Sequence, residues 1–196
     1  MELQVAPHII IRQAHESDAP AMGKMMVETF LRAHRGQIPD EVWRRRKEEW
    51  TWEVSARGWR NALQDIAGGS SPAECIFLAV IREPNGPGER IVGLVMGGPA
   101  RVGPWEAGGE IYALYVRQDY HRQGIGRRLV QAGVRSLVES GMEQLVIRSL
   151  PQNDPANRFY EALGGQAVGE WEDEDYGMQI PQRIYGWEDS LGLLEV

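Results

Sequence analysis

The sequence is poor in cysteine and contains no long hydrophobic run. Its 196 residues include one cysteine, Cys75, so the chain cannot form an internal disulfide bond. No apolar stretch approaches the roughly 20 residues that a membrane-spanning helix needs. The segment 1–5 lacks the basic start and apolar centre of a secretory signal. These absences predict a soluble, cytoplasmic protein. Cys75 lies in the apolar run 75–80, a predicted buried strand, so it is interpreted as a core residue rather than a nucleophile.

Positive charge is not in excess either. The 21 lysine and arginine residues are outnumbered by 28 aspartate and glutamate residues, which gives a formal net charge of −7. This balance argues against a broad contact with phosphate backbones, so nucleic acid is not an expected partner. The acidic segment 170–175 is predicted to be a solvated face, with attraction of a cationic substrate as the alternative.

No internal repeat or low-complexity segment divides the chain. The length suits one well-buried domain, and we expect a single domain over 1–196 with its core at 8–189. The turn-rich segments 68–72 and 83–90 are short enough to be loops between elements, and the second is expected to close a hairpin.

Hydrophobic periodicity predicts a mixed α/β structure. A first helix follows Ser17 and Asp18, and a longer helical region follows Asp40, either continuous or kinked near Thr51. A helix through 124–140 between two strands requires a parallel crossover, whereas hairpins in the first half favour antiparallel pairing. Seven strands are predicted, at 8–13, 74–82, 90–98, 110–117, 144–150, 166–172 and 182–188.

The segment 110–130 carries the strongest functional signal, because a strand there leads through a glycine turn into a helix. Gly124 and Gly126 allow close approach of a ligand, and the helix that follows directs free N–H groups toward an anion. Arg127 and Arg128 in its first turn fit a bound phosphate, since cations are otherwise disfavoured at a helix N-terminus. The turn alone leaves phosphate binding and tight packing both open.

Two common nucleotide-binding motifs are absent from this turn. A dinucleotide fingerprint would need a third glycine where Leu129 stands. A Walker loop would need Gly-Lys-Ser/Thr, which the chain lacks. The glycine turn therefore matches neither motif.

A second block follows the predicted strand at 144–150. Residues 153–164 read Asn-Asp-Pro-Ala-Asn-Arg-Phe-Tyr-Glu-Ala-Leu-Gly. Together with the glycine turn, this block resembles the GNAT superfamily of N-acetyltransferases, whose second motif is Asn-x-x-Ala-x-x-Phe-Tyr-Glu-x-Leu-Gly. The resemblance extends to the first strand and helix and to the last strand, and it is weakest over 32–72.

This resemblance implies a fold and a co-substrate. The fold would be a mostly antiparallel seven-stranded sheet flanked by helices, with a splayed parallel strand pair at the cofactor site. Acetyl-CoA would bind with its pyrophosphate at the glycine turn and its pantetheine arm along the splayed strand, and no metal is expected. The residues assigned to acetyl-CoA are Leu114, Tyr115, Val116, His121, Arg122, Gln123, Gly124, Ile125, Gly126, Arg127, Asn153 and Tyr160.

The chain departs from the family pattern at two positions. His121 stands where the family usually has Arg or Gln, which puts one side-chain contact in doubt; it is interpreted as an anion contact, with an acid/base role as the alternative. Gly165 stands where Phe is usual, although Gly164 and Gly165 still make a good helix stop.

The catalytic candidates also come from the resemblance. Tyr160 matches the family's general acid, with a core or CoA-packing role as the alternative. Glu110 stands where some members keep a carboxylate base, with an exposed strand-end charge as the alternative. A backbone N–H near Leu114 or Tyr115 is expected to stabilise the oxyanion, and Asn153 either contacts CoA or only begins a helix.

The acceptor site is less defined. One of Tyr112 and Tyr115 is expected to line it, and the tryptophans of 43–59 either line a groove, bury in a dimer or pack in the core. The function predicted is acetyl transfer from acetyl-CoA to a primary amine of a small molecule or protein, by direct attack in a ternary complex. A non-catalytic acyl-CoA sensor and a nucleotide-binding domain are the alternatives, and a homodimer is left open.

Overall fold

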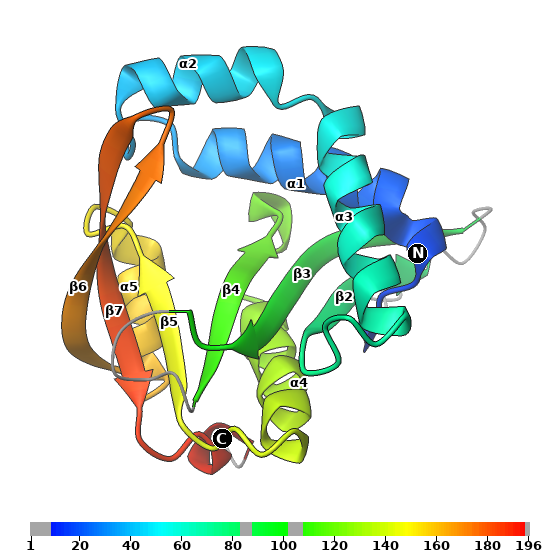
Figure 1. Ribbon diagram of the computed structural model, residues 1–196, viewed down its shortest axis with the longest axis vertical. Helices are drawn as coiled ribbons and strands as arrows, with labels where there is room; N and C mark the ends of the chain where they lie inside the picture. The colour runs from blue at the N-terminus through cyan, green and yellow to red at the C-terminus, as the bar shows by residue number, and fades with distance from the viewer. Residues whose placement is uncertain (1–8, 83–87, 102–107, 195–196) are drawn as a thin grey trace, which may run out of the picture.

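A twisted seven-stranded sheet forms the centre of the computed structural model, which describes residues 9–82, 88–101 and 108–194 (Figure 1). The strand order is β1-β2-β3-β4-β5-β7-β6. All neighbouring strands pair antiparallel except β4 and β5, which are parallel. The predicted fold class is therefore confirmed. The strands are β1 Ile9–Gln13, β2 Cys75–Arg82, β3 Glu89–Pro99, β4 Gly109–Val116, β5 Leu145–Ser149, β6 Gln166–Asp175 and β7 Met178–Trp187.

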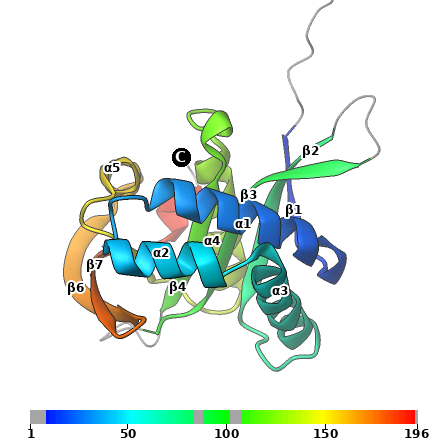
Figure 2. The ribbon, with the colours of Figure 1, turned by 90° about the horizontal axis from the view of Figure 1, so that it is seen from above.

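Helices cover the sheet on its two faces. Helix α4 packs against β2, β3 and β4, whereas α1 contacts β3 and β4 and packs closely on α3. Figures 1 and 2 show α1 and α2 lying next to each other across the end of the sheet toward which β4 runs. No helix in the described part of the chain is long and apolar enough to cross a membrane. The helices are α1 Ala19–Ala33, α2 Asp40–Glu49, α3 Trp52–Ala67, α4 Ile125–Glu139 and α5 Asp154–Ala162, with a final 3-10 turn at Leu191–Leu194.

Strand β2 explains why the core has two halves. Its side chains alternate, so Ile76 and Leu78 pack with α1 and α3, while Ala79 and Ile81 pack with α4. A strand covered on both faces reads as a continuous apolar run, as the sequence 75–81 does. Cys75 within this run is buried, as predicted, and burial raises the pKa of its thiol.

The helical region after Asp40 is broken, as the kinked alternative predicted. Trp50 leaves the helical conformation, and the Thr51 hydroxyl then accepts a hydrogen bond from the Val54 N–H at 3.4 Å, which starts α3. The break lets Trp50 pack edge-on against Phe30 of α1. The break therefore lets both α2 and α3 pack against α1, whereas one continuous helix would extend past it.

Strands β6 and β7 are longer than predicted and meet in a tight turn. Tyr176 and Gly177 both have left-handed φ angles, 51° and 74°, which suit a two-residue hairpin. The acidic segment 170–175, predicted as a solvated face, is thus the end of β6. Its two inward carboxylates, Asp173 and Asp175, form ion pairs with arginines.

The unusual Gly165 has a packing reason. A Cβ at this position would lie 2.5 Å from the Trp187 ring, whose Nε1 donates to the Leu163 carbonyl at 2.9 Å. Trp187 of β7 therefore occupies the space beside the helix end. Gly164 has a φ of 83°, as the predicted helix stop requires.

The crossing of α1 and α3 makes a testable prediction. A Cβ on Gly23 would lie 2.5 Å from the Trp52 carbonyl oxygen and 2.7 Å from the Ala56 nitrogen. We expect Gly23→Ala to lower the free energy of unfolding by about 1–3 kcal/mol, because the helices must separate. The matched control is Gly58 in α3, where a Cβ meets nothing within 4 Å; Gly58→Ala should raise that free energy by about 0.5–1 kcal/mol. Urea unfolding measures both, and equal effects would contradict the close crossing.

Candidate functional site

A cleft of about 1130 Å³ opens where β4 and β5 diverge. The two strands pair only over Gly109–Ile111 and Leu145–Ile147, and Figure 1 shows them separating toward α1 and α2. The cleft is lined by the outer half of β4, the loop before α4, the starts of α4 and α5, and parts of α1, α2 and the β6–β7 hairpin. The open end of a strand pair therefore joins the glycine turn to the second sequence motif.

A β-bulge in β4 lies where the strands separate. The register between β3 and β4 shifts between Met96 and Gly97, so that Tyr112 has no Cα partner on β3. Bulges bend a strand and increase its twist. Because pairing with β5 stops at Ile111, the β5-facing backbone groups of 113–116 have no strand partner. They form a polar edge along the cleft.

The glycine turn ends in a left-handed residue that starts α4. Gly124 has a φ of 74°, and Arg122 is also left-handed with a φ of 61°. The first helical N–H to bond within α4 is that of Arg128, which donates to the Gly124 carbonyl at 3.1 Å. The N–H groups of Ile125, Gly126 and Arg127 therefore have no carbonyl partner in the helix. Residues 124–127 all line the cleft, at the positive end of the helix dipole.

The two glycines of the turn serve different purposes. Gly124 is open to solvent on its Cβ side and is required by its φ angle. A Cβ on Gly126 would lie 3.2 Å from the Phe159 ring of α5, so this glycine lets the two helix starts approach each other. The tight-packing interpretation and the anion interpretation thus apply to the same turn.

Three arginines surround this helix start. Arg122 and Arg127 line the cleft together with Arg158 of α5. Arg158 was not among the predicted site residues, because the second motif leaves its position unspecified. Arg128 is turned away, because its guanidinium donates to the Ile9 carbonyl at 3.0 Å on β1. The expectation that Arg128 faces a phosphate is therefore wrong.

His121 lines the cleft beside the glycines, whereas Gln123 does not. The Nε2 of His121 is 2.9 Å from the Val116 carbonyl, so the imidazole donates there and ties the loop to the end of β4. Gln123 is exposed and is not among the residues that line the cleft. Asn153 lines the cleft and also accepts a hydrogen bond from the Ala156 N–H at 3.4 Å. Its side chain therefore begins α5, which was the alternative interpretation.

Tyr160 reaches the cleft from α5. Its side chain is 6% exposed and packs between the rings of Phe159 and Tyr185, each with its centroid 5.6 Å away. Burial raises the pKa of Tyr160 well above the ordinary value. The phenol is therefore protonated at neutral pH, as a proton donor must be.

Glu110 is completely buried, so the alternative of an exposed strand-end charge is wrong. Its Oε1 accepts a hydrogen bond from Arg148 Nε at 2.9 Å, and its Oε2 accepts one from the Arg101 backbone N–H at 2.9 Å. Arg148 also binds Asp173 at 2.6 Å. Arg148 and Asp173 line the cleft, but Glu110 does not. Arg148 thus stands between the carboxylate and the cleft.

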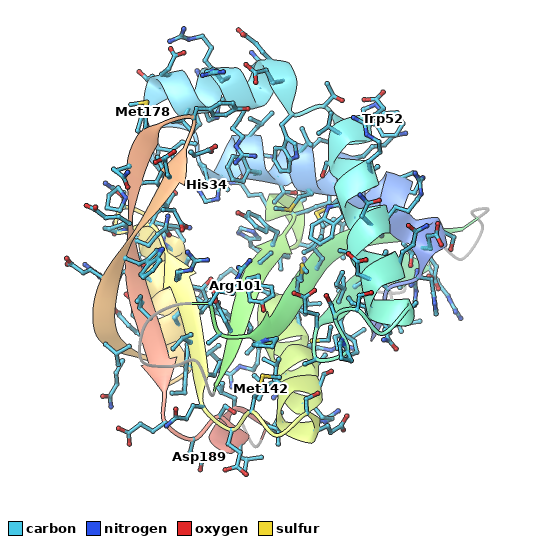
Figure 3. All side chains as sticks on the ribbon, viewed as in Figure 1. His34, Trp52, Arg101, Met142, Met178 and Asp189 are labelled. Atoms are coloured by element: carbon cyan, nitrogen blue, oxygen red, sulfur yellow. The ribbon has the colours of Figure 1, made fainter. Side chains whose placement is uncertain are left out.

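The far end of the cleft is formed by α1, α2 and the β6–β7 hairpin. Arg46 of α2 pairs with Asp175 at 2.8 Å, which connects the helix to the hairpin. His34, at the end of α1, is 2.9 Å from the hydroxyl of Tyr115, and Figure 3 shows His34 below α1, facing the interior. Tyr112 and Tyr115 both line the cleft, whereas none of the tryptophans in 43–59 does.

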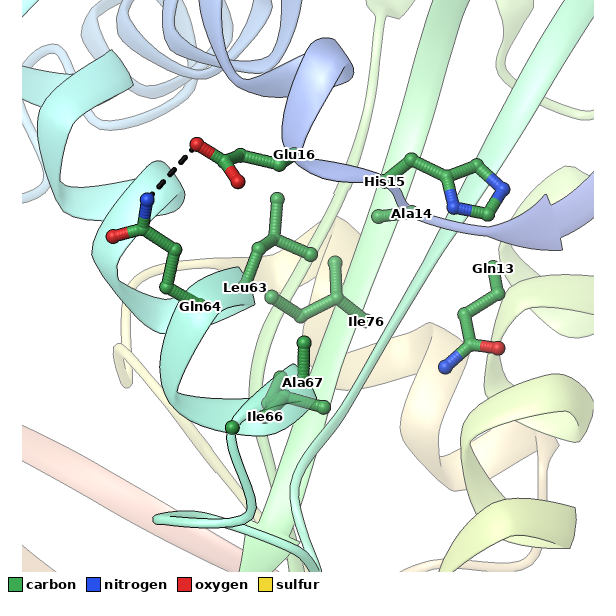
Figure 4. A pocket seen from close by; sticks show the side chains of 10 residues that line it. Gln13, Ala14, His15, Glu16, Leu63, Gln64, Ile66, Ala67 and Ile76 are labelled. Atoms are coloured by element: carbon green, nitrogen blue, oxygen red, sulfur yellow. Dashed lines mark hydrogen bonds between the residues drawn. The ribbon is translucent and has the colours of Figure 1, made fainter.

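A second hollow of about 480 Å³ lies apart from both motifs. Leu63 and Ile76 form its floor, and Gln64 donates to Glu16 at 2.9 Å at its edge (Figure 4). It contains none of the predicted site residues. The described residues also hold no cluster of three or more His, Cys, Asp or Glu side chains that could bind a metal ion.

Comparison with known protein sequences places residues 35–165 within a family model described as the acetyltransferase (GNAT) family. An uncharacterized N-acetyltransferase of Bacillus subtilis, YuaI, is 31% identical over 103 residues, which cover 53% of this chain and 59% of that protein. A mycothiol acetyltransferase of Corynebacterium aurimucosum is 38% identical over 56 residues, which cover 29% of this chain and 18% of that protein. The chain thus spans less than two thirds of these relatives.

Solved structures share the fold over most of the chain. The PaiA N-acetyltransferase of Thermoplasma acidophilum, in complex with coenzyme A, has a TM-score of 0.65 at 15% identity and covers 90% of this chain and 98% of its own. YncA of Salmonella typhimurium, with acetyl-CoA, has a TM-score of 0.63 at 18% identity and covers 91% and 92%. At these identities the likeness is one of fold.

The buried ion pair predicts an asymmetric response to mutation. Arg148→Met removes the closer of the two guanidinium groups at the buried Glu110 carboxylate and leaves only that of Arg101, at 3.6 Å and half exposed, so we expect the free energy of unfolding to fall by about 3 kcal/mol. The control is Arg44, whose pair with Glu41 on α2 is exposed; Arg44→Met should change that free energy by less than about 0.5 kcal/mol. Denaturant unfolding of both variants checks this, and a negligible loss in Arg148→Met would argue against a structural ion pair.

Proposed function

Because the chain belongs to the acetyltransferase (GNAT) family, we propose that it transfers the acetyl group of acetyl-CoA to a primary amine, by direct attack in a ternary complex. The observation that carries this proposal is the cleft itself. It is continuous from the free N–H groups of α4, past the unpaired edge of β4, to Tyr160 and a chamber under α1 and α2. Two substrates can therefore enter from opposite ends and meet at the divergent strands.

The anion end of the cleft suits the pyrophosphate of CoA. We assign the pyrophosphate to the N–H groups of Ile125, Gly126 and Arg127, where the helix dipole favours negative charge. The guanidinium groups of Arg122 and Arg158 add positive charge at the same end. The alternative of a nucleotide without pantetheine leaves the long edge of β4 without a ligand.

The pantetheine arm is assigned to β4. Its two amides need hydrogen-bond partners, and 113–116 present backbone groups to the cleft that no strand satisfies. A backbone N–H near Leu114 or Tyr115 can also donate a hydrogen bond to the thioester oxygen as negative charge develops on it. This assignment uses the divergence of the strands for both binding and catalysis.

Tyr160 is assigned as the general acid. When the amine has attacked the carbonyl carbon and the C–S bond breaks, the departing sulfur needs a proton. A buried phenol with a raised pKa carries that proton throughout the neutral range. Among the residues of the second motif that line the cleft, Tyr160 alone has a hydroxyl.

Glu110 is assigned a positioning role rather than direct proton transfer. Both of its oxygens already accept hydrogen bonds, and it does not line the cleft. It holds Arg148, which in turn holds Asp173 at the cleft wall. The acceptor end is thus shaped by a chain of charges that begins at the buried carboxylate.

The test is release of free thiol from acetyl-CoA in the presence of a panel of amines, amino acids and peptides. Tyr160→Phe should lower kcat by about 10²-fold or more, since a positioned acid contributes that much, while CoA binding measured by calorimetry is retained. The matched control is Tyr185→Phe, a neighbouring buried tyrosine that does not line the cleft, and it should retain kcat. CoA binding without turnover on any amine would instead indicate an acyl-CoA sensor.

A further inference from the structure

A histidine is buried at the acceptor end of the cleft. His34 caps the end of α1 and is 7% exposed, whereas the other described histidines, His15 and His121, are exposed. Its Nε2 is 2.9 Å from the Tyr115 hydroxyl and its Nδ1 is 3.4 Å from the Gln37 Oε1. A buried imidazole with a polar partner near each nitrogen has a restricted orientation.

Several elements hold His34 in place. The Phe30 ring, one turn earlier in α1, lies 4.5 Å from the imidazole centroid to centroid. Trp43 of α2 donates its Nε1 to the Leu31 carbonyl at 3.0 Å, which fixes the end of α1 from the other side. The loop at 34–39, in which Gly36 has a left-handed φ of 75°, turns the chain back so that α2 lies alongside α1.

The hydrogen bonds define the tautomer. The Gln37 Oε1 faces Nδ1 and can only accept, so in this orientation Nδ1 carries the proton and donates to Gln37, while Nε2 keeps a lone pair. The Tyr115 hydroxyl then donates to Nε2. The result is a neutral imidazole that accepts from a phenol, and the phenol oxygen keeps lone pairs that can face the cleft.

The surroundings favour this uncharged state. Burial lowers the pKa of His34, and burial raises the pKa of Tyr115 against an opposing influence of Arg46. Arg46 is itself neutralised by Asp175 at 2.8 Å. Tyr160 also lies near the pair: its pKa is raised first by burial and then by the neighbouring phenol of Tyr115.

Two tyrosines therefore line the part of the cleft where the amine and the thioester are proposed to meet. Tyr115 projects from β4 and Tyr160 from α5, and both line the cleft. An amine attacking a thioester between them must lose a proton on one side, while the sulfur gains a proton on the other. Of the two tyrosines, Tyr115 has a proton acceptor behind it, the Nε2 of His34 at 2.9 Å.

We propose that Tyr115 and His34 form a relay that accepts the proton of the attacking amine, an inference that rests on the proposed acetyltransferase function. As the C–N bond forms, the amine nitrogen becomes strongly acidic and gives its proton to the Tyr115 oxygen. The Tyr115 proton passes to Nε2 of His34, so Tyr115 is catalytic and His34 acts through it.

The proton balance closes within the cleft. The C–S bond breaks as Tyr160 protonates the sulfur, which leaves His34 as imidazolium and Tyr160 as phenolate. One proton passes from His34 to solvent and one returns to Tyr160, so the net products are the amide and the free thiol of CoA. No oxidant, metal ion or further reactant takes part.

The kinetic test uses the pH dependence of kcat with both substrates saturating. In the wild-type protein kcat should fall at acid pH, with a midpoint below the ordinary histidine value of about 6.5, because protonated His34 cannot accept a proton. His34→Gln and Tyr115→Phe should lower kcat by about 10²-fold, with the KM for acetyl-CoA changed less than about threefold. The residual activity of His34→Gln should lack the acid limb.

Two variants separate the relay from other roles. His15→Gln, which removes an exposed histidine outside the cleft, should keep both kcat and the acid limb. Glu110→Gln should retain the acid limb even if its kcat falls, because Glu110 does not transfer the proton. Loss of the limb in Glu110→Gln, or its survival in His34→Gln, would overturn the relay while leaving the acetyltransferase function intact.

A second measurement does not depend on turnover. In nitrogen-15 NMR spectra of histidine-labelled protein, His34 should carry its proton on Nδ1, and its Nε2 signal should shift in Tyr115→Phe. A proton on Nε2 would overturn the relay regardless of activity. A wild-type protein that binds CoA but acetylates no amine would overturn the proposed function, and the relay with it.

Discussion

The separation of β4 from β5 is the constraint on which the site depends. The strands pair for three residues, and the bulge at Tyr112 then turns β4 away. The Glu110–Arg148 pair lies at this point, with the carboxylate on β4 and the guanidinium on β5. A buried charge pair with a fixed geometry holds the two strands at their point of divergence. Beyond it, β4 offers backbone groups, and the gap becomes the cleft.

The ends of two helices complete what the strands begin. The start of α4 supplies unpaired N–H groups and the start of α5 supplies Asn153 and Arg158. Gly126 favours their close approach, since a Cβ there would lie 3.2 Å from the Phe159 ring and the ring would have to shift. Packing and binding are therefore not alternatives at this turn: the same absence of a side chain brings the helices together and leaves the amides accessible.

The sequence predicted the order of elements well because strand and helix periodicities are local. The apolar run at 75–81, the stripe of α4 and the turn at Gly164 each reflect contacts made within one element or with a large uniform core. The predicted bounds were less accurate where the end of a strand is held by contacts with other elements. Strands β6 and β7 run longer than expected. The end of β6 is polar, and its Asp173 and Asp175 pair with Arg148 and Arg46, which alternation of hydrophobicity does not reveal.

By itself, the sequence determined the glycine turn, the second motif, the family and the position of Tyr160 in α5, since these depend on short patterns of residues. Only the tertiary structure decided that Glu110 is buried against Arg148, that Arg128 faces away from the cleft, and that His34 contacts Tyr115. The physical reason is distance along the chain. His34 and Tyr115 are brought together by the packing of α1 on the sheet, and no local pattern encodes which side chain will lie opposite a histidine after folding.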